Sequence, residues 1–182
     1  IYLKKKNKLA QDTLVVTVMS NIGLTIAAKE HGVKLATTAV GDWYVLKKKK
    51  NSGYNLGGEQ SGHMIFLDYN TTGDGALSSL VLAQIVLEEG KKLSELAAVM
   101  TEYPQVLINA RIKNENKNKY MEYPEIKNEI ERIENLLDGC GRVLIRPSGT
   151  EPLVRVMLEG KEEGQIKELA TNLANLIQEK LS

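Results

Sequence analysis

The sequence of 182 residues contains little cysteine, few aromatic residues and almost no net charge. Its one cysteine, Cys140, cannot form an internal disulfide and is typical of a reducing cytoplasm. Lys and Arg total 24 against 23 Asp and Glu, so the formal charge of +1 argues against binding nucleic acid through bulk electrostatics. Aromatic residues make up only 5%, which leaves few platforms for stacking bases. We therefore expect a cytoplasmic protein with no nucleic-acid partner.

Long apolar runs are also missing. No stretch approaches the roughly 18 consecutive apolar residues of a membrane-spanning helix, so we expect no membrane partner. The hydrophobic content of 42% is instead spread over short runs, enough for one large core or two small ones. The chain begins with Ile1 rather than methionine, and its first six residues resemble the end of an amphipathic helix. We therefore expect a fragment of a longer protein.

Several catalytic signatures are absent as well. The sequence has no Walker loop and no arrangement of Ser, His and Asp, or of Cys and His, that supports a nucleophile. The aspartates and glutamates are scattered without the spacing of metal ligands. We predict no metal site among these residues.

The first half of the chain alternates between strand and helix patterns. Strands are predicted at residues 14–18, 34–38, 54–56 and 64–67, and helices at 20–31, 41–50, 74–87 and 94–100. Asp74 and Ser94 are the expected caps of the last two helices. The lysines at 47–50 are expected to be solvated. Apolar residues of the third helix fall at helical spacing: Leu77, Leu80, Val81, Ile85 and Leu87. Alternating order predicts a layered α/β domain with helices on both sheet faces.

The pattern changes after Tyr103 and Pro104. Apolar residues alternate from Val106 to Ile112, which predicts a strand with one buried face. A polar, lysine-rich stretch, a helix, two strands and a last helix follow; these elements are expected at residues 113–119, 126–137, 142–146, 153–158 and 166–177. This order predicts a small α+β domain over residues 104–182, preceded by the α/β domain over residues 1–103.

One segment joins two predicted strands through a turn rich in proline and glycine. It begins at Arg146, and Arg155 follows in the second strand. Gly149 lets the backbone approach a ligand and present its N–H groups, while Ser148 and Thr150 add hydroxyl groups. Two guanidinium groups can bind a phosphate bidentately. The segment predicts a phosphate site; the alternative is an ordinary turn whose arginines cover apolar surface.

A second glycine-rich segment, residues 57–63, lies between two short predicted strands. Glu59 and Ser61 offer an acceptor and a donor side by side. A carboxylate can accept from two neighbouring sugar hydroxyls because it has two oxygens. His63 adds a proton carrier or hydrogen-bond donor. The segment predicts a sugar-binding loop; the alternative is a hairpin turn with a surface glutamate.

Five segments taken together resemble the C-terminal half of bacterial members of the α-D-phosphohexomutase superfamily. In order along the chain they are VGD at 40–42, YNLGGEQSGH at 54–63, DYNTTGDG at 68–75, YPQV at 103–106 and GRVLIRPSGTEPLVRV at 141–156. Gln60 between Glu59 and Ser61 resembles the branch that acts on glucosamine phosphates. The resemblance covers essentially the whole chain. It implies most of the family's third domain, which has a mixed sheet in an α/β/α sandwich, and all of its fourth, which is TATA-box-binding-protein-like.

The resemblance also implies which residues bind substrate. They are Glu59, Ser61 and His63 in the sugar-hydroxyl loop, and Arg146, Ser148, Gly149, Thr150 and Arg155 in the phosphate loop. The family reaction interconverts glucosamine 6-phosphate and glucosamine 1-phosphate through a phosphoserine and a bisphosphorylated intermediate, and it serves amino-sugar nucleotide and cell-wall precursor synthesis. The implied enzyme class is an isomerase that transfers a phosphoryl group within the sugar.

Two departures from the family pattern are visible. The phosphoserine segment and the Mg²⁺ loop match nothing here, so the resemblance implies that these lie in missing N-terminal domains and that this chain alone is inactive. Trp43 stands where the family usually has arginine. The alternatives are a phosphomannomutase/phosphoglucomutase and a sugar-phosphate-binding module with no catalysis.

Overall fold

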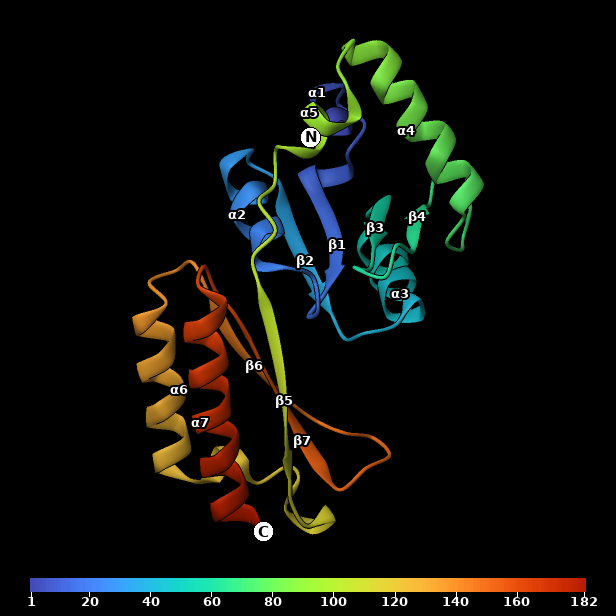
Figure 1. Cartoon of the computed structure of the whole chain (residues 1–182). Coiled ribbons are helices and arrows are strands. Elements are labelled where there is room, and N and C mark those ends of the chain that lie inside the picture. Colours follow the sequence, from blue (N-terminus) through green and yellow to red (C-terminus); the bar gives the residue numbers. More distant parts are fainter. The chain divides into compact units, whose positions relative to one another are not determined.

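The computed structural model describes residues 1–182, which form two compact units, Ile1–Glu102 and Tyr103–Ser182 (Figure 1). Each unit has its own sheet. The first sheet is mixed and four-stranded, and the second is antiparallel and three-stranded. The predicted α/β class, with a mixed sheet followed by a small α+β unit, is confirmed. None of the helices is long and apolar enough to cross a bilayer.

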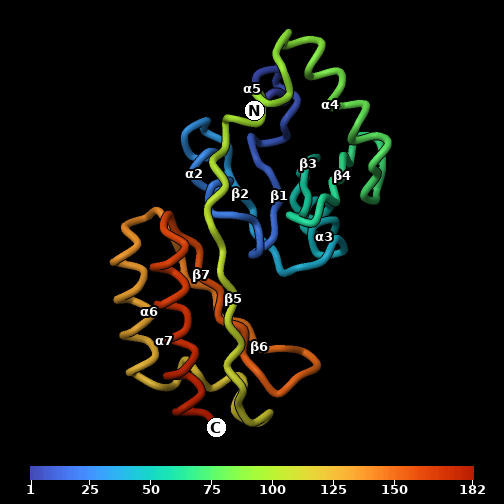
Figure 2. The backbone as a smooth tube through the Cα atoms, in the orientation of Figure 1, coloured from blue at the N-terminus to red at the C-terminus, as the bar shows by residue number.

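The first sheet is built around its longest apolar strand. β1 (Thr13–Thr17) runs parallel to β2 (Lys34–Thr38) on one side and to β3 (Leu56–Gly58) on the other, and β3 pairs antiparallel with β4 (Met64–Phe66). The order across the sheet is therefore β2-β1-β3-β4 (Figure 2). A central position explains why β1 is a continuous apolar run, since a strand covered on both faces has no polar side.

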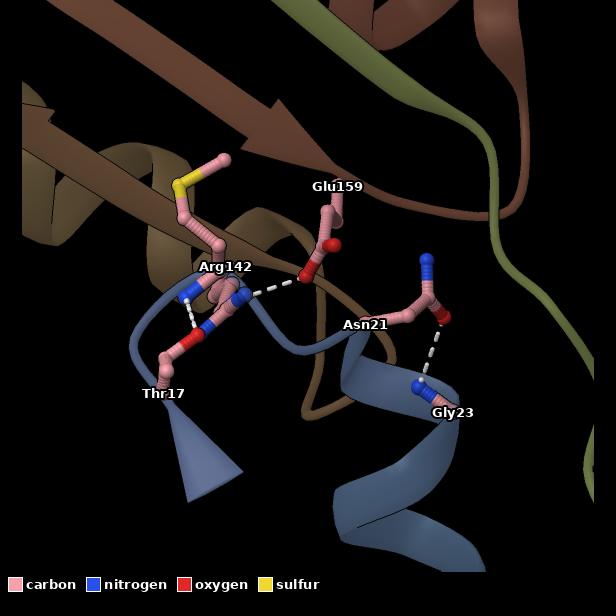
Figure 3. A network of polar contacts seen from close by, with 6 residues as sticks. Thr17, Asn21, Gly23, Arg142 and Glu159 are labelled. Carbon is pink, nitrogen blue, oxygen red and sulfur yellow. Dashed lines mark hydrogen bonds and ion pairs between the residues drawn. The ribbon is translucent and has the colours of Figure 1, made fainter. Parts of the chain in front are cut away.

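The helices of the first unit are α1 (Tyr2–Lys5), α2 (Ile22–Glu30), α3 (Asp42–Ser52), α4 (Gly75–Glu89) and α5 (Leu93–Ala97). Asn21 starts α2, because its side-chain oxygen accepts from the N–H of Gly23 at 3.0 Å (Figure 3). α3 covers one face of the sheet. Its Val45 packs with Val15 and Ile65 in a small buried cluster.

One expected helix cap is wrong, and the apolar stripe of α4 is only partly buried. Ser94 does not cap α5; the helix starts after Lys92, whose N–H donates to the Glu95 carboxylate at 2.8 Å. α4 does begin at Asp74, whose carboxylate accepts from the N–H of Leu77 at 2.9 Å, yet α4 contains no buried residue. Helical spacing of apolar residues marks a face, but it does not ensure that the same stretch of chain covers that face.

The lysines near the end of α3 are not all solvated, which corrects a further expectation. Lys47 and Lys48 are exposed, whereas Lys49 is fully buried and its Nζ donates to the carbonyl of Ile65 at 2.6 Å. Burial lowers the pKa of Lys49 to about 8, partly opposed by the charge of Asp68. The third lysine of the run is turned towards β4 by the helical period, and the sequence of four lysines gave no sign of this.

The second unit follows the predicted order of strand, helix, two strands and helix. These are β5 (Gln105–Arg111), α6 (Pro124–Leu136), β6 (Arg142–Pro147), β7 (Leu153–Glu159) and α7 (Glu163–Leu181). β7 lies between β5 and β6, and the two helices lie side by side along the sheet (Figure 2). Two 3₁₀ turns, Asn114–Asn116 and Tyr120–Glu122, occupy the connection from β5 to α6.

A single apolar core holds the second unit together. It is formed by one side of the sheet and the facing stripes of both helices: Ala110, Ile112, Ile126, Ile133, Leu137, Val154, Val156, Leu158, Ile166, Leu169, Ala170, Leu173, Ala174, Ile177 and Leu181. The alternation along β5 places Val106, Ile108 and Ala110 against this core. The residues between them therefore lie on the other face of the sheet, where side chains are available for contacts of another kind.

Candidate functional site

The glycine loop, residues 57–63, closes the hairpin between β3 and β4. The N–H of Glu59 donates to the carbonyl of His63 at 2.9 Å, and the N–H of Gly62 donates to the carbonyl of Glu59 at 3.1 Å. Gly62 has φ of +96°, a conformation that side chains with a Cβ rarely adopt. Two backbone hydrogen bonds and the backbone conformation of Gly62 therefore determine the shape of the loop.

The Glu59 carboxylate is held in one orientation by a residue from another element. Its Oε1 accepts from the N–H of Gly41, directly before α3, at 2.9 Å. This contact uses one lone pair, so Oε2 and the second lone pair of Oε1 can still accept from a ligand. A carboxylate that is already oriented loses less entropy when it binds a hydroxyl group.

Ser61 and His63 are exposed in the same loop as Glu59. The Ser61 hydroxyl lies 3.4 Å from Nδ1 of the His63 ring. The loop also borders a groove of about 400 Å³. The other walls of this groove are mainly apolar, with polar residues among them: Leu14, Val16, Leu24, Met64, Met100, Ser20, Asn21 and Glu102. The structure thus gathers Glu59, Ser61 and His63 in one accessible loop beside an apolar surface.

Trp43 lies two residues beyond the Glu59 contact, on the first turn of α3. Its side chain is exposed, its ring meets the Tyr44 ring edge-on at 5.1 Å, and Lys47 Nζ lies 4.7 Å from its centre. A cation over an indole face contributes about 0.5–1 kcal/mol at an exposed site. Trp43 therefore supplies an apolar ring where the resemblance implies a guanidinium group.

The arginine loop, residues 146–152, connects β6 and β7 and has internal hydrogen bonds of its own. The N–H of Ser148 donates to the carbonyl of Leu153 at 2.9 Å, and the Ser148 hydroxyl accepts from the N–H of Glu151 at 3.2 Å. Ser148 is buried, whereas Gly149 and Thr150 are exposed. The serine therefore shapes the turn, and the two residues after it form the open surface.

Arg146 and Arg155 stand directly opposite each other on β6 and β7. Glu151 lies 3.5 Å from Arg155, and no carboxylate lies within 4.0 Å of the Arg146 guanidinium. Like charges facing each other across two strands destabilise a sheet. At the other end of the same strands Arg142 faces Glu159, and Nε lies 2.5 Å from the carboxylate oxygen (Figure 3). One end of this strand pair is thus neutralised, while the other holds an excess of positive charge that suits an anion.

Two family models match the chain. Residues 1–103 match "Phosphoglucomutase/phosphomannomutase, alpha/beta/alpha domain III", and residues 107–176 match "Phosphoglucomutase/phosphomannomutase, C-terminal domain". The chain belongs to this phosphoglucomutase/phosphomannomutase family.

Curated relatives agree with this membership, and a solved structure shares the fold. Phosphoglucosamine mutase of Clostridioides difficile is 83% identical over 180 residues, which are 99% of this chain and 40% of that protein. Phosphoglucosamine mutase of Caldanaerobacter subterraneus is 59% identical over 182 residues, or 100% of this chain and 41% of that protein. The chain therefore spans about 40% of the length of these relatives. The crystal structure of Aspergillus fumigatus N-acetylphosphoglucosamine mutase with GlcNAc-6P and magnesium has a TM-score of 0.75 at 18% identity, covering 99% of this chain and 41% of that one.

Magnesium does not fit the residues of this chain. The ion is held by several oxygen ligands, commonly carboxylates. No group of three or more His, Cys, Asp or Glu side chains is placed to hold a metal ion. What these domains offer to a substrate is hydrogen bonding and positive charge.

Two residues near the arginine loop were missed by the sequence analysis. Asn109 lies directly opposite Arg155 on β5, so it extends the row formed by Arg146 and Arg155. Lys117 donates from Nζ to the carbonyl of Ser148 at 2.8 Å. The alternation along β5 placed Asn109 on the outer face, but its partner depends on strand register. No local signal marks Lys117 among the neighbouring lysines.

Proposed function

We propose that this chain is the substrate-binding half of a phosphoglucosamine mutase, which interconverts glucosamine 6-phosphate and glucosamine 1-phosphate. The observation that carries the proposal is the pair of arginines that face each other at the arginine loop, where only Arg155 has a carboxylate partner, Glu151 at 3.5 Å. An anion bound there relieves their repulsion and receives charge-assisted hydrogen bonds. The relative that is 83% identical favours glucosamine phosphate among the sugars of the family.

The two loops have separate tasks in this proposal. The arginine loop binds the phosphate that is not being transferred, through Arg146, Arg155 and the exposed backbone at Gly149 and Thr150. The glycine loop orients the sugar: Glu59 accepts from its hydroxyls, and Ser61 and His63 lie beside it. A substrate that binds in two orientations needs an anchor and a clamp that serve both. Positioning and charge neutralisation supply much of the rate in phosphoryl transfer.

The remaining parts of the reaction belong to domains outside this chain. We assign to them the serine that carries the phosphoryl group through the bisphosphorylated intermediate, and the ligands of Mg²⁺, which supplies electrostatic stabilisation of the transferring phosphoryl group. The partners of this chain are then the sugar phosphate and the N-terminal domains of the same protein, working in the cytoplasm in cell-wall precursor synthesis.

The test uses the full-length protein assayed separately with glucosamine, mannose and glucose 6-phosphates. We expect the highest kcat/KM for glucosamine 6-phosphate and a large loss for Arg146→Gln. Arg132→Gln is the matched control, because Arg132 is an exposed arginine of α6 that pairs with Glu129 at 2.7 Å. A preference for mannose or glucose phosphate would favour the phosphomannomutase/phosphoglucomutase alternative, and equal activity of both variants would remove the arginine loop from the site.

Measurements on the 182-residue chain by itself distinguish binding from catalysis. We expect it to bind phosphate weakly and to show no mutase activity, since it lacks a phosphoryl donor and a metal site. Weak means millimolar, about 4 kcal/mol, for a single anion site. Turnover by the pure chain would contradict this division. A full-length protein that binds sugar phosphate without turnover would favour the non-catalytic module.

A further inference from the structure

The connection from β5 to α6 reaches the arginine loop through one side chain. Lys117 Nζ donates to the carbonyl oxygen of Ser148 at 2.8 Å, and the Lys117 side chain is half-buried. The two residues are 31 positions apart, so the contact is tertiary. No carboxylate lies within 4.0 Å of this ammonium group. Its partner is therefore the backbone of the loop rather than an acidic side chain.

The backbone that carries Lys117 is itself fastened at two places. Asn116 donates from its side chain to the carbonyl of Leu181, at the end of α7, at 3.0 Å. The Tyr120 hydroxyl donates to the carbonyl of Ile145 in β6 at 3.3 Å, and burial raises the pKa of Tyr120. These contacts lie on either side of Lys117 in sequence. They hold its backbone against the strand that leads into the arginine loop.

The carbonyl that Lys117 binds belongs to the peptide group between Ser148 and Gly149. A trans peptide is planar, and its C=O and N–H point in opposite directions. A bond that fixes the Ser148 carbonyl therefore fixes the Gly149 N–H on the opposite side of the loop. No other residue contacts this carbonyl by a hydrogen bond. Lys117 is thus the one side chain that sets the direction of the amide at the open surface of the loop.

We propose that Lys117 is a positioning residue of the phosphate site, holding the Ser148–Gly149 peptide so that the Gly149 N–H points at the anion. The inference rests on the proposed function. Lys117 also adds a third positive charge near Arg146 and Arg155 without an acidic partner to cancel it. The anion gains from both effects, but the orientation of the amide is the specific one.

Phosphate titrations of the 182-residue chain, followed by amide NMR, test this role. We expect Lys117→Met to weaken inorganic phosphate binding about 3- to 10-fold and to shift the Gly149 amide resonance before any phosphate is added. Lys113→Met is the control, because Lys113 is an exposed lysine of the same connection between β5 and α6. It should leave both readouts unchanged. Lys117→Arg keeps a donor and a charge and should restore both.

Three outcomes would overturn or separate the ideas. Equal phosphate affinity of Lys117→Met and Lys113→Met overturns the positioning role. If Lys117→Met lowers the melting temperature while Lys117→Arg restores the fold but not the Gly149 shift, Lys117 is structural and the proposal fails. If the parent chain itself shows no phosphate-dependent shift at the loop, the proposed function fails, whereas hydrogen exchange of the Gly149 amide in Lys117→Met still decides the positioning role.

Discussion

The two units of the chain differ in how they are packed. In Tyr103–Ser182 both helices and one side of the sheet meet in one continuous buried core. In Ile1–Glu102 the buried cluster consists of Val15, Val45 and Ile65, and α4 contributes no buried residue. An apolar groove of about 330 Å³ lies along α4 and is lined by Leu56, Phe66, Val81 and other residues. Apolar surface of this kind is stabilised when it is covered.

The difference in packing indicates which interactions make each loop rigid. The arginine loop extends two strands that belong to the well-packed core, so its geometry follows from the fold of its own unit. The glycine loop depends on local backbone hydrogen bonds and on the contact between Glu59 and Gly41. In the proposed function, the phosphate site is therefore preformed mainly by packing, and the sugar site by a few polar contacts.

Separating the two units gives the largest expected effect. Residues 103–182, produced alone, should unfold in one cooperative transition, because their core is complete within the unit. Residues 1–102, produced alone, should melt broadly and bind the dye ANS, since their apolar faces are only partly covered. Circular dichroism and dye fluorescence measure both, with the whole chain as the control. An equally sharp transition for residues 1–102 would contradict the contrast in packing.

Glu59→Ala tests the polar contacts on which the glycine loop depends. Losing a charged hydrogen-bond partner should cost about 1.5–3 kcal/mol of transition-state binding, or roughly 10- to 150-fold in kcat/KM of the full-length protein. Glu30→Ala, which removes an exposed carboxylate at the end of α2, is the control. Inhibition by inorganic phosphate should change little, since the proposed phosphate site is the arginine loop of the other unit. An unchanged kcat/KM would make Glu59 a turn residue.

Lys49→Met tests whether the buried ammonium group of Lys49 destabilises the first unit. Below about pH 8 Lys49 is charged in both the folded and the unfolded chain. Burying its ammonium group then lowers the free energy of unfolding by about 3 kcal/mol. The unfolded chain keeps its proton up to about pH 10.5, so stability should rise between pH 8 and 10.5. Lys49→Met should remove this rise and stabilise the unit by about 1–2 kcal/mol at pH 7, because part of the gain is lost with the bond to Ile65.

The measurement is urea unfolding followed by tryptophan fluorescence. Trp43 is the only tryptophan in the chain and lies on the same helix as Lys49, so its emission reports on the first unit. Lys48→Met is the matched control, since Lys48 is exposed one position away. Destabilisation by Lys49→Met at pH 7 would mean that the bond to the Ile65 carbonyl outweighs the desolvation of the ammonium group.

Much of the fold could be predicted from local patterns. The alternation in β5, the Asp74 cap and the bounds of β2 all depend on neighbours in sequence, and the structure confirms them. The burial of Lys49 and the exposure of α4 could not be predicted in this way. Both depend on which elements pack against each other. A run of lysines or a stripe of leucines does not indicate these tertiary contacts.

The same distinction between local sequence and tertiary contacts applies to the candidate site. The turn chemistry of both loops was visible because glycine, serine and proline act on their own backbone. The facing of Arg146 and Arg155 depends on strand register, the bond from Gly41 to Glu59 joins two elements, and Lys117 reaches the loop from 31 residues away. The sequence marked candidate residues in both loops, whereas their orientation, and the contact from Lys117, depend on tertiary structure.

Arg155→Lys is the mildest of these substitutions and the sharpest test of the proposed phosphate site. Lysine keeps the charge but cannot reproduce the planar, two-pronged contact of a guanidinium group, so phosphate binding by the 182-residue chain should weaken about 10-fold. The lysine stem can still cover the neighbours on β7, so the melting temperature should stay near that of the parent. Arg132→Lys on α6 is the control. Phosphorus and amide NMR titrations at low and moderate salt, with thermal melts of all three proteins, measure these effects. Parent-like binding by Arg155→Lys would show that charge alone matters, and unfolding of the unit would show that Arg155 serves the fold rather than the phosphate.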